Sequence, residues 1–169
     1  NELLIITPGT HSKWILVKNG MILWFSTFMT GDVHSAIVNH TIISALDCSK
    51  KNAPNKTFKN GVKLGYSEKN HLTHILFGAR TKVLFEELGK ERISDYVSGI
   101  LIGAEIASGL SHFNKPPTEI LLIGNKNLCL HYQQAFQIYQ IETSILEEMD
   151  TTKSYIKVAE YAKLIKTSS

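Results

Sequence analysis

The chain has 169 residues, 43% of them hydrophobic, and a formal net charge of +3 at pH 7. That length and apolar content can bury one core, so we expect a single domain over residues 1–169. The lysines are spread along the chain without a long basic block, which argues against a nucleic-acid-binding protein. No apolar run reaches the roughly 18 residues of a membrane span, and no charged-then-apolar leader opens the chain. We therefore expect a cytoplasmic protein that binds neither nucleic acid nor membrane.

The first 29 residues predict an antiparallel meander of three strands. The runs 3–7, 11–18 and 21–29 are rich in β-branched and aromatic residues, and Asn19-Gly20 between the last two is typical of a two-residue hairpin turn. Apolar side chains fall on both faces of the second and third strands. We therefore expect helices to cover the sheet on each side.

A block of helices is predicted to follow the meander. Apolar residues at helical spacing predict four helices, over residues 33–47, 58–69, 71–89 and 93–113. Asp32 or Thr30 can cap the first helix, and Gly89 is a plausible stop for the third. Gly99 and Gly103 leave a groove on the fourth helix, which either packs tightly against another backbone or admits a nucleotide or a second lobe. Residues 49–56 read as a polar loop.

The C-terminal third alternates strands with helices. Residues 118–123 form a continuous apolar run, typical of a central parallel strand, that ends in Gly124-Asn125. A helix over 128–139, an edge-like strand over 141–147 and a final helix over 151–166 follow. The predicted order is three strands, a helical block, then strand–helix–strand–helix.

The bend between the first two strands is the main candidate site. Gly9 lets the backbone approach a ligand, consecutive turn N–H groups can converge on an anion, and Lys13 adds a point charge that attracts phosphate. The bend therefore reads either as a phosphate-holding loop, with Thr10, His11 and Ser12 between these residues, or as an ordinary polar hairpin turn.

Other reactive residues carry weaker signals. Cys48 and Cys129 lie in apolar surroundings without a Cys-x-x-Cys pair, which favours reduced core thiols. His71 and His74, at helical i,i+3 spacing, could form half of a metal site, but no third ligand has convincing spacing. A solvated helix face is the favoured interpretation, and the metal, if any, stays unknown.

Four blocks, in this order, resemble the C-terminal half of the 2-keto-3-deoxygalactonokinase family. The blocks are Pro8-Gly9-Thr10-His11-Ser12-Lys13-Trp14, Thr27-Phe28-Met29-Thr30-Gly31-Asp32, Leu76-Phe77-Gly78-Ala79-Arg80 and Asp95-Tyr96-Val97-Ser98-Gly99-Ile100-Leu101-Ile102-Gly103-Ala104-Glu105. The family belongs to the sugar kinase, actin and heat-shock ATPase superfamily, whose two lobes close around ATP. The resemblance implies an α/β, ribonuclease H-like lobe: a mixed sheet with an antiparallel three-strand meander, helices on both faces and a helical insertion after the third strand.

The resemblance also implies roles for particular residues. The bend with Gly9, Thr10, His11, Ser12 and Lys13 would meet the β- and γ-phosphates of the nucleotide. Gly124 and Asn125 would contact adenosine, because ligands of open sheets lie beyond the carboxyl ends of the strands. The alternative for Gly124 is a simple strand-ending glycine.

Asp32 and Arg80 are the remaining candidates from the resemblance. Asp32 would orient magnesium-bound water, the alternative being a helix cap. Arg80 would bind an acidic substrate or a phosphate, the alternative being a surface ion pair.

The reaction implied by the resemblance is ATP-dependent phosphorylation of 2-keto-3-deoxygalactonate to its 6-phosphate, with ATP and Mg²⁺ as cofactors. The catalytic aspartate belongs to the first lobe, so we expect no catalytic residue in this chain. The expected partners are the sugar acid, an N-terminal lobe from the same gene or a separate chain, and a second copy in a homodimer. The alternatives are a stand-alone, non-catalytic nucleotide- or phosphate-binding lobe or assembly module, and a remnant that binds nothing. The family tends to carry small residues near the start of the final helix, where that helix meets the hinge between the two lobes. This chain has Lys153-Ser154-Tyr155-Ile156 there instead, which puts closure of the hinge in question.

Overall fold

A five-stranded mixed sheet forms one end of the protein in the computed structural model, which describes residues 2–46 and 55–147. The strands lie in the order β3-β2-β1-β4-β5. Their bounds are β1 Glu2–Thr7, β2 Ser12–Lys18, β3 Met21–Phe28, β4 Ile120–Gly124 and β5 Ser144–Glu147. β1, β2 and β3 pair antiparallel, whereas β4 runs parallel to β1 and β5 parallel to β4. This order confirms the α/β, ribonuclease H-like fold.

The turns that shape the sheet follow from local chemistry. Asn19 and Gly20 both have positive φ, 51° and 77°, as a two-residue turn between twisted strands requires. β1 and β2 pair from Glu2 opposite Lys18 to Thr7 opposite Lys13, so the loop after Thr7 lies at the carboxyl end of β1. β4 pairs with β1 in parallel, and its last residue therefore reaches the same edge.

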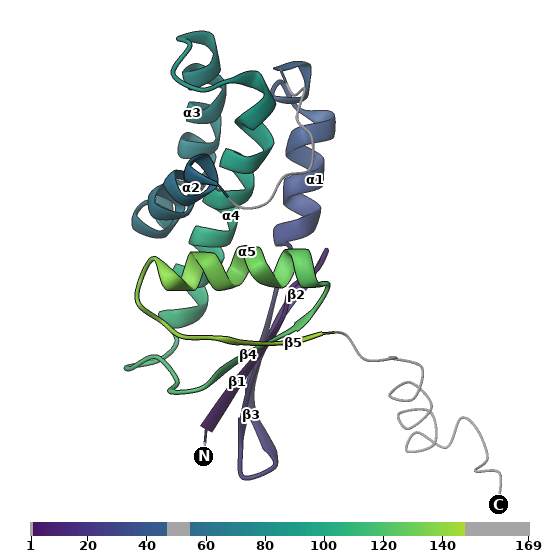
Figure 1. Cartoon of the computed structure of the whole chain (residues 1–169), viewed down its shortest axis with the longest axis vertical. Helices are drawn as coiled ribbons and strands as arrows, with labels where there is room; N and C mark the ends of the chain where they lie inside the picture. The colour runs from purple at the N-terminus through teal and green to yellow at the C-terminus, as the bar shows by residue number, and fades with distance from the viewer. Residues whose placement is uncertain (1, 47–54, 148–169) are drawn as a thin grey trace, which may run out of the picture.

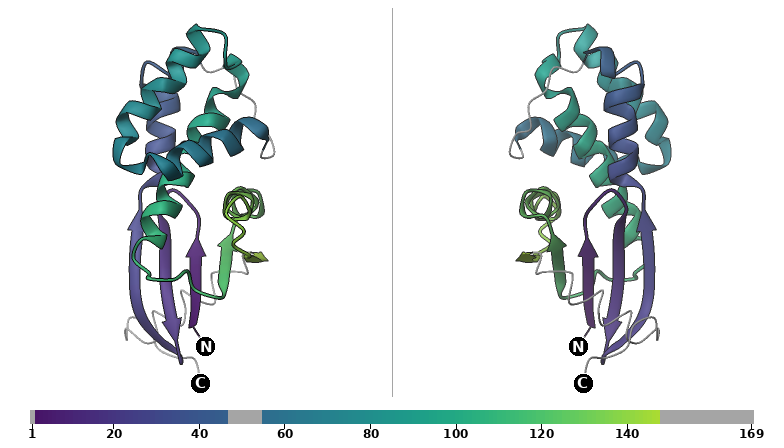
Figure 2. Two further views of the ribbon diagram at one scale, coloured as in Figure 1. Left: turned by 90° about the vertical axis from the view of Figure 1, so that its left-hand side faces the viewer. Right: turned by 90° about the vertical axis from the view of Figure 1, so that its right-hand side faces the viewer.

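Most of the helices form a layer beyond that edge of the sheet (Figure 1). Their bounds are α1 Thr30–His40, α2 Lys56–Ser67, α3 Leu72–Leu84, α4 Ile93–Leu110 and α5 Lys126–Gln137. α1, α2, α3 and the start of α4 make up the layer, α4 continues down to the sheet, and α5 lies across the strands. Figure 2 shows α5 end-on beside β4. Short 3-10 helices, η1 (Ser44–Leu46), η2 (Lys69–His71) and η3 (Lys90–Arg92), link parts of the layer.

Two helices, α1 and α3, end more than one turn before the residue that the sequence predicts. α1 ends at His40 because Thr41 is extended, with φ −114° and ψ −179°, in a stretch of β-branched residues. α3 ends at Leu84 because Glu86, with φ 60°, adopts the left-handed conformation and the Glu87 N–H donates to the Lys82 carbonyl at 2.8 Å. Gly89, the predicted stop, instead has φ −65° and precedes η3.

Glycines bring α2 and α4 into backbone contact. A Cβ at Gly99 or Gly103 of α4 would collide with the carbonyl oxygen of Phe58 or Val62 on α2, and one at Gly65 of α2 would collide with that of Ile100. The tight-packing interpretation of the α4 glycines is therefore confirmed. The alternative, a groove that admits a nucleotide or a second lobe, is wrong because α2 fills it.

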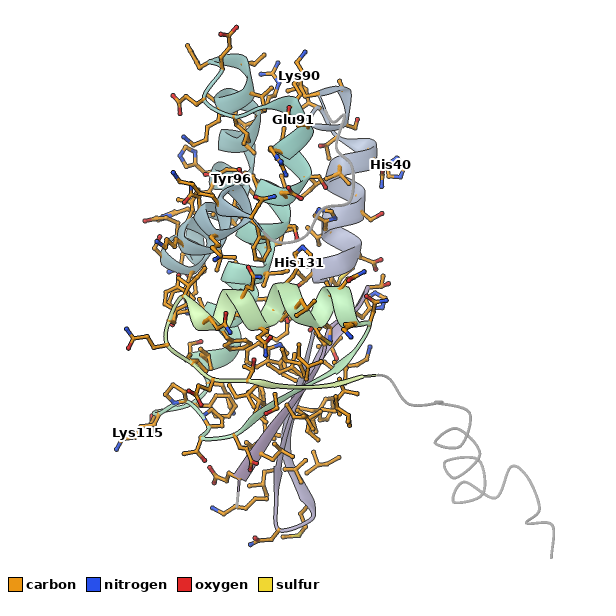
Figure 3. All side chains as sticks on the ribbon, viewed as in Figure 1. His40, Lys90, Glu91, Tyr96, Lys115 and His131 are labelled. Atoms are coloured by element: carbon orange, nitrogen blue, oxygen red, sulfur yellow. The ribbon has the colours of Figure 1, made fainter. Side chains whose placement is uncertain are left out.

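The core has two parts that meet along α4. One lies between the sheet and the helices α4 and α5, and its fully buried members include Trp14, Phe58, Ile106, Leu122 and Tyr132. The other lies inside the helical layer and includes Ile43, Ala79, Ile93, Val97 and Ile100. α5 also contacts the layer: His131, labelled in Figure 3, meets the ring of Phe58 edge-on at 5.0 Å between centroids.

The described helices cover one face of the sheet. Leu4, Ile6 and Trp14 point to that face, whereas Phe25 on the opposite face is 71% exposed. The final helix predicted over 151–166 and Cys48 lie outside the described residues. Cys129 is fully buried, as predicted. No helix in the described ranges is long and apolar enough to cross a membrane.

Candidate functional site

The bend between β1 and β2 is a solvent-accessible loop with backbone N–H groups available to a ligand. Thr10 and His11 are exposed and Gly9 is half-buried. The N–H groups of these three residues donate no hydrogen bond to the described part of the chain, apart from bonds within helices and strands. A Cβ on Gly9 would meet only the His11 carbonyl oxygen, at 4.0 Å, so the outer side of the bend is open. This geometry can receive an anion on the backbone.

The start of α1 packs against the back of the bend. A Cβ on Gly31 would lie 2.6 Å from both the Gly9 oxygen and the Thr10 Cα, so only glycine fits there. The Asp32 N–H donates to the Thr10 carbonyl at 3.1 Å, and Asp32 Oδ2 lies 2.6 Å from His11 Nε2. The segment Thr30-Gly31-Asp32 is therefore the rear wall of the bend.

The predicted helix cap at Thr30 or Asp32 is wrong. α1 begins after Met29, which makes no side-chain capping bond. The Thr30 hydroxyl donates to Glu105 instead, and the Asp32 carboxylate pairs with His11. Asp32 still lies in the first turn of α1, where the positive end of the helix dipole favours a carboxylate.

Beneath the bend lies a carboxylate that sequence reasoning did not single out. Glu105 of α4 is 3% exposed and accepts four hydrogen bonds. Its Oε1 accepts from Ser12 Oγ and Trp14 Nε1, each at 2.7 Å, and its Oε2 accepts from the Tyr132 hydroxyl at 2.7 Å and from the Thr30 hydroxyl. Burial, with the negative charge of Glu105, raises the pKa of the Tyr132 hydroxyl well above its usual range. A lone charge in the apolar run 96–110 was the available signal for this cluster, because such a charge needs partners when buried.

The hydrogen bonds around Glu105 determine the position of the Ser12 side chain in the site. Its side chain is fully buried and its hydroxyl donates into the core. The Ser12 hydroxyl therefore supports the bend from beneath. Lys13, the next residue, is exposed, and its Nζ folds back to donate to the His11 carbonyl at 2.8 Å. Its positive charge therefore lies beside the bend.

Gly124 and Asn125 lie next to the bend. Gly124 has φ +148°, and a Cβ there would be 3.4 Å from the Pro8 carbonyl oxygen. Asn125 is exposed and caps α5, because its Oδ1 accepts from the N–H groups of Asn127, at 3.1 Å, and Leu128, at 3.3 Å. The structure thus brings together the two segments that the sequence proposed as nucleotide contacts, at the carboxyl ends of β1 and β4.

Arg80 and the histidine pair lie elsewhere. Arg80 is on α3, in the helical layer away from the sheet (Figure 1), with its guanidinium 5.8 Å from the centre of the Phe77 ring. Among the described residues it forms no ion pair. His71 pairs with Glu68 at 3.1 Å, His74 is exposed, and the described residues contain no cluster of three metal-ligating side chains.

Comparison with known proteins points to one family. The family model described as 2-keto-3-deoxy-galactonokinase matches residues 1–157. The chain is 35% identical over 134 residues to 2-dehydro-3-deoxygalactonokinase of Escherichia coli (strain K12), covering 79% of this chain and 45% of that protein. It is 27% identical over 158 residues to the Rhizobium meliloti (strain 1021) protein named "Probable 2-dehydro-3-deoxygalactonokinase DgoK1", covering 92% of this chain and 51% of that protein.

A solved structure agrees with these matches. The crystal structure of a candidate 2-dehydro-3-deoxygalactonokinase protein from Sinorhizobium meliloti superposes with a TM-score of 0.85 and 27% identity, covering 96% of this chain and 55% of that chain. The chain spans about half the length of the curated relatives it matches. The match over residues 1–157 shows that the chain belongs to the 2-keto-3-deoxy-galactonokinase family.

Proposed function

We propose that this chain is the nucleotide-binding half of a kinase that phosphorylates the 6-hydroxyl of 2-keto-3-deoxygalactonate at the expense of ATP. Family membership supports the reaction. The observation that carries the nucleotide-binding role is the open bend beside Gly124, where the amides of Gly9, Thr10 and His11 donate no hydrogen bond outside the helices and strands of the described chain.

The residues of the bend suit the terminal phosphates of a nucleotide. The amides of Gly9, Thr10 and His11 would hold the phosphate oxygens, and Lys13 would add charge as transfer proceeds. Gly124 and Asn125, one strand away, would place the adenosine. Asp32 Oδ1 accepts no hydrogen bond from the described residues, so it would hold a water of hydrated Mg²⁺. Bound Mg-ATP supplies the phosphoryl group and neutralises its charge.

Activation of the sugar hydroxyl needs a carboxylate near the acceptor. In the described part of the chain, the carboxylates at the bend are Asp32, which pairs with His11, and Glu105, which is buried. We therefore assign that step, and most of the sugar-acid contacts, to a first lobe. Because the chain matches only about half of each relative, a second candidate function is a non-catalytic nucleotide-binding lobe. A measurement of phosphoryl transfer distinguishes this lobe from half of a kinase.

The binding role is tested by calorimetric titration of the 169-residue chain with Mg-ADP and with AMP. If the bend holds the terminal phosphate, Mg-ADP binds and AMP binds at least about tenfold more weakly, because one charge-assisted phosphate contact is worth roughly that much. Lys13→Ala should weaken Mg-ADP by about tenfold for the same reason. Lys63→Ala, at an exposed lysine on α2, is the matched control and should leave the affinity unchanged. Equal affinities for ADP and AMP, or unaltered binding by Lys13→Ala, would contradict the assignment of the bend.

A further inference from the structure

Glu105 is held by neutral groups alone. Its four donors are three hydroxyls and an indole N–H, and no basic side chain among the described residues bonds to it. Burying a carboxylate is unfavourable unless hydrogen bonds replace its hydration. Two donors on each oxygen satisfy the lone pairs that an acceptor-only carboxylate presents.

The donors tie together the parts of the fold that shape the bend. Ser12, which donates to Oε1, directly follows His11 in the chain, so this hydrogen bond anchors one end of the bend. On Oε2, Thr30 directly precedes Gly31, whose backbone lies against Gly9 and Thr10. Tyr132 adds α5, the helix that begins beside Gly124. The Glu105 carboxylate therefore holds both the end of the bend at Ser12 and the rear wall at Thr30.

We propose that Glu105 is a positioning residue for nucleotide binding, which holds Ser12 and Thr30 so that the amides of Gly9, Thr10 and His11 keep the spacing that phosphate oxygens need. The inference rests on the proposed function. Glu105 lies beneath the bend and acts through these two hydroxyls. Small displacements of donors that surround a phosphate have large effects on its binding, because every contact depends on the same geometry.

Glu105→Gln is the informative substitution because it preserves shape. The Trp14 indole can only donate, so the new amide must keep its carbonyl toward Ser12 and Trp14. Its NH₂ group then faces the Thr30 and Tyr132 hydroxyls, which have to turn and accept. The variant therefore keeps the packing of α4 but removes the charge and reverses the bond that anchors α1.

The experiment measures two quantities on the full chain. The first is the dissociation constant of Mg-ADP by calorimetry. The second, without nucleotide, is the hydrogen-exchange rate of the Asp32 amide by NMR, because that amide donates to the Thr10 carbonyl and reports the junction of α1 with the bend. Val97→Ala is the matched control: Val97 is fully buried on the same helix, but in the core of the helical layer, so its loss destabilises the protein without reaching the bend.

We expect Glu105→Gln to raise the dissociation constant and the exchange rate by about tenfold each, at a temperature where the variant is folded. Val97→Ala should change neither, although it lowers the melting temperature. If Glu105→Gln changes neither quantity, or if Val97→Ala changes both equally, the positioning role is overturned. If the unmodified chain binds no Mg-ADP, the proposed function fails, and the exchange rate alone then decides whether Glu105 shapes the bend.

A second substitution covers the case in which Glu105→Gln does not fold. Thr30→Val has nearly the same shape and removes one donor, leaving three bonds on Glu105. We expect a smaller change of both quantities in the same direction. An unchanged Asp32 exchange rate in Thr30→Val would overturn the proposal as well.

Discussion

At the scale of single residues, Tyr132 links the hydrogen bonds beneath the bend to the pH dependence of the protein's stability. Its hydroxyl is buried and donates to Glu105, and burial with that negative charge raises its pKa well above 10.0. Ionised tyrosine would place a second negative charge against a buried carboxylate. The hydroxyl therefore stays protonated in the folded chain at pH values where an exposed tyrosine has ionised.

This raised pKa predicts a loss of stability at alkaline pH. Below about pH 10, Tyr132 is protonated in both states and contributes nothing to the pH dependence. Above that value the unfolded state loses the proton while the folded state keeps it, so the free energy of unfolding falls by up to about 1.4 kcal/mol per pH unit. Urea denaturation between pH 9 and 11 should show this slope in the unmodified chain and a shallower slope in Tyr132→Phe. Equal slopes would mean that the hydroxyl ionises as readily in the folded state.

At the scale of elements, the crossing of α2 and α4 depends on the absence of side chains. A Cβ on Gly65 would collide with the Ile100 carbonyl, and the backbone of a helix cannot move aside as a flexible side chain can. The close approach brings Phe58 of α2 into the core beneath α4. Because α4 also carries Glu105, the crossing helps to place the helix that supports the bend.

The same change, glycine to alanine, at two positions tests the crossing of α2 and α4. Gly65→Ala should destabilise the chain by about 3 kcal/mol, within the range of severe core overpacking. Gly78→Ala on α3, where a Cβ would meet nothing within 4 Å, should be neutral or stabilise by up to about 1 kcal/mol through helix propensity. Chemical denaturation measures both. A small effect of Gly65→Ala would show that the helices can separate at little cost.

At the scale of the whole molecule, the proposed function gives this chain one side of a two-lobed site. The bend, its rear wall and Gly124 lie at one edge of the sheet, and the described carboxylates there are engaged or buried. The family relatives are about twice as long as the matched region. Under the proposed function, phosphoryl transfer to a sugar acid would need groups that these residues do not place at the bend.

We accordingly expect the 169-residue chain to bind Mg-ADP yet to phosphorylate 2-keto-3-deoxygalactonate at no more than the background rate. A coupled assay that follows ADP release, with and without the sugar acid, measures this. The full-length Escherichia coli relative is a suitable positive control. Robust, sugar-dependent ADP release by this chain would show that its own residues complete the site.

The meander, the turn at Asn19-Gly20, the position of the bend and the strand that ends at Gly124 were all predictable from the sequence. Each depends on neighbours within a few residues: alternation of apolar side chains, turn chemistry and a break after an apolar run. Helix ends were less accurate, because a left-handed residue such as Glu86 carries no composition signal as strong as glycine.

Only the tertiary structure decided what Glu105, Thr30 and Ser12 do. Ser12 and Glu105 are 93 positions apart, and the sequence contains no periodicity that pairs a hydroxyl on a strand with a carboxylate on a distant helix. Their contact exists because α4 packs on the sheet through its apolar side chains, which places Glu105, the one charge within residues 96–110, under the bend. Short-range patterns thus determined the elements and the candidate loop, whereas long-range burial determined which polar groups had to satisfy one another.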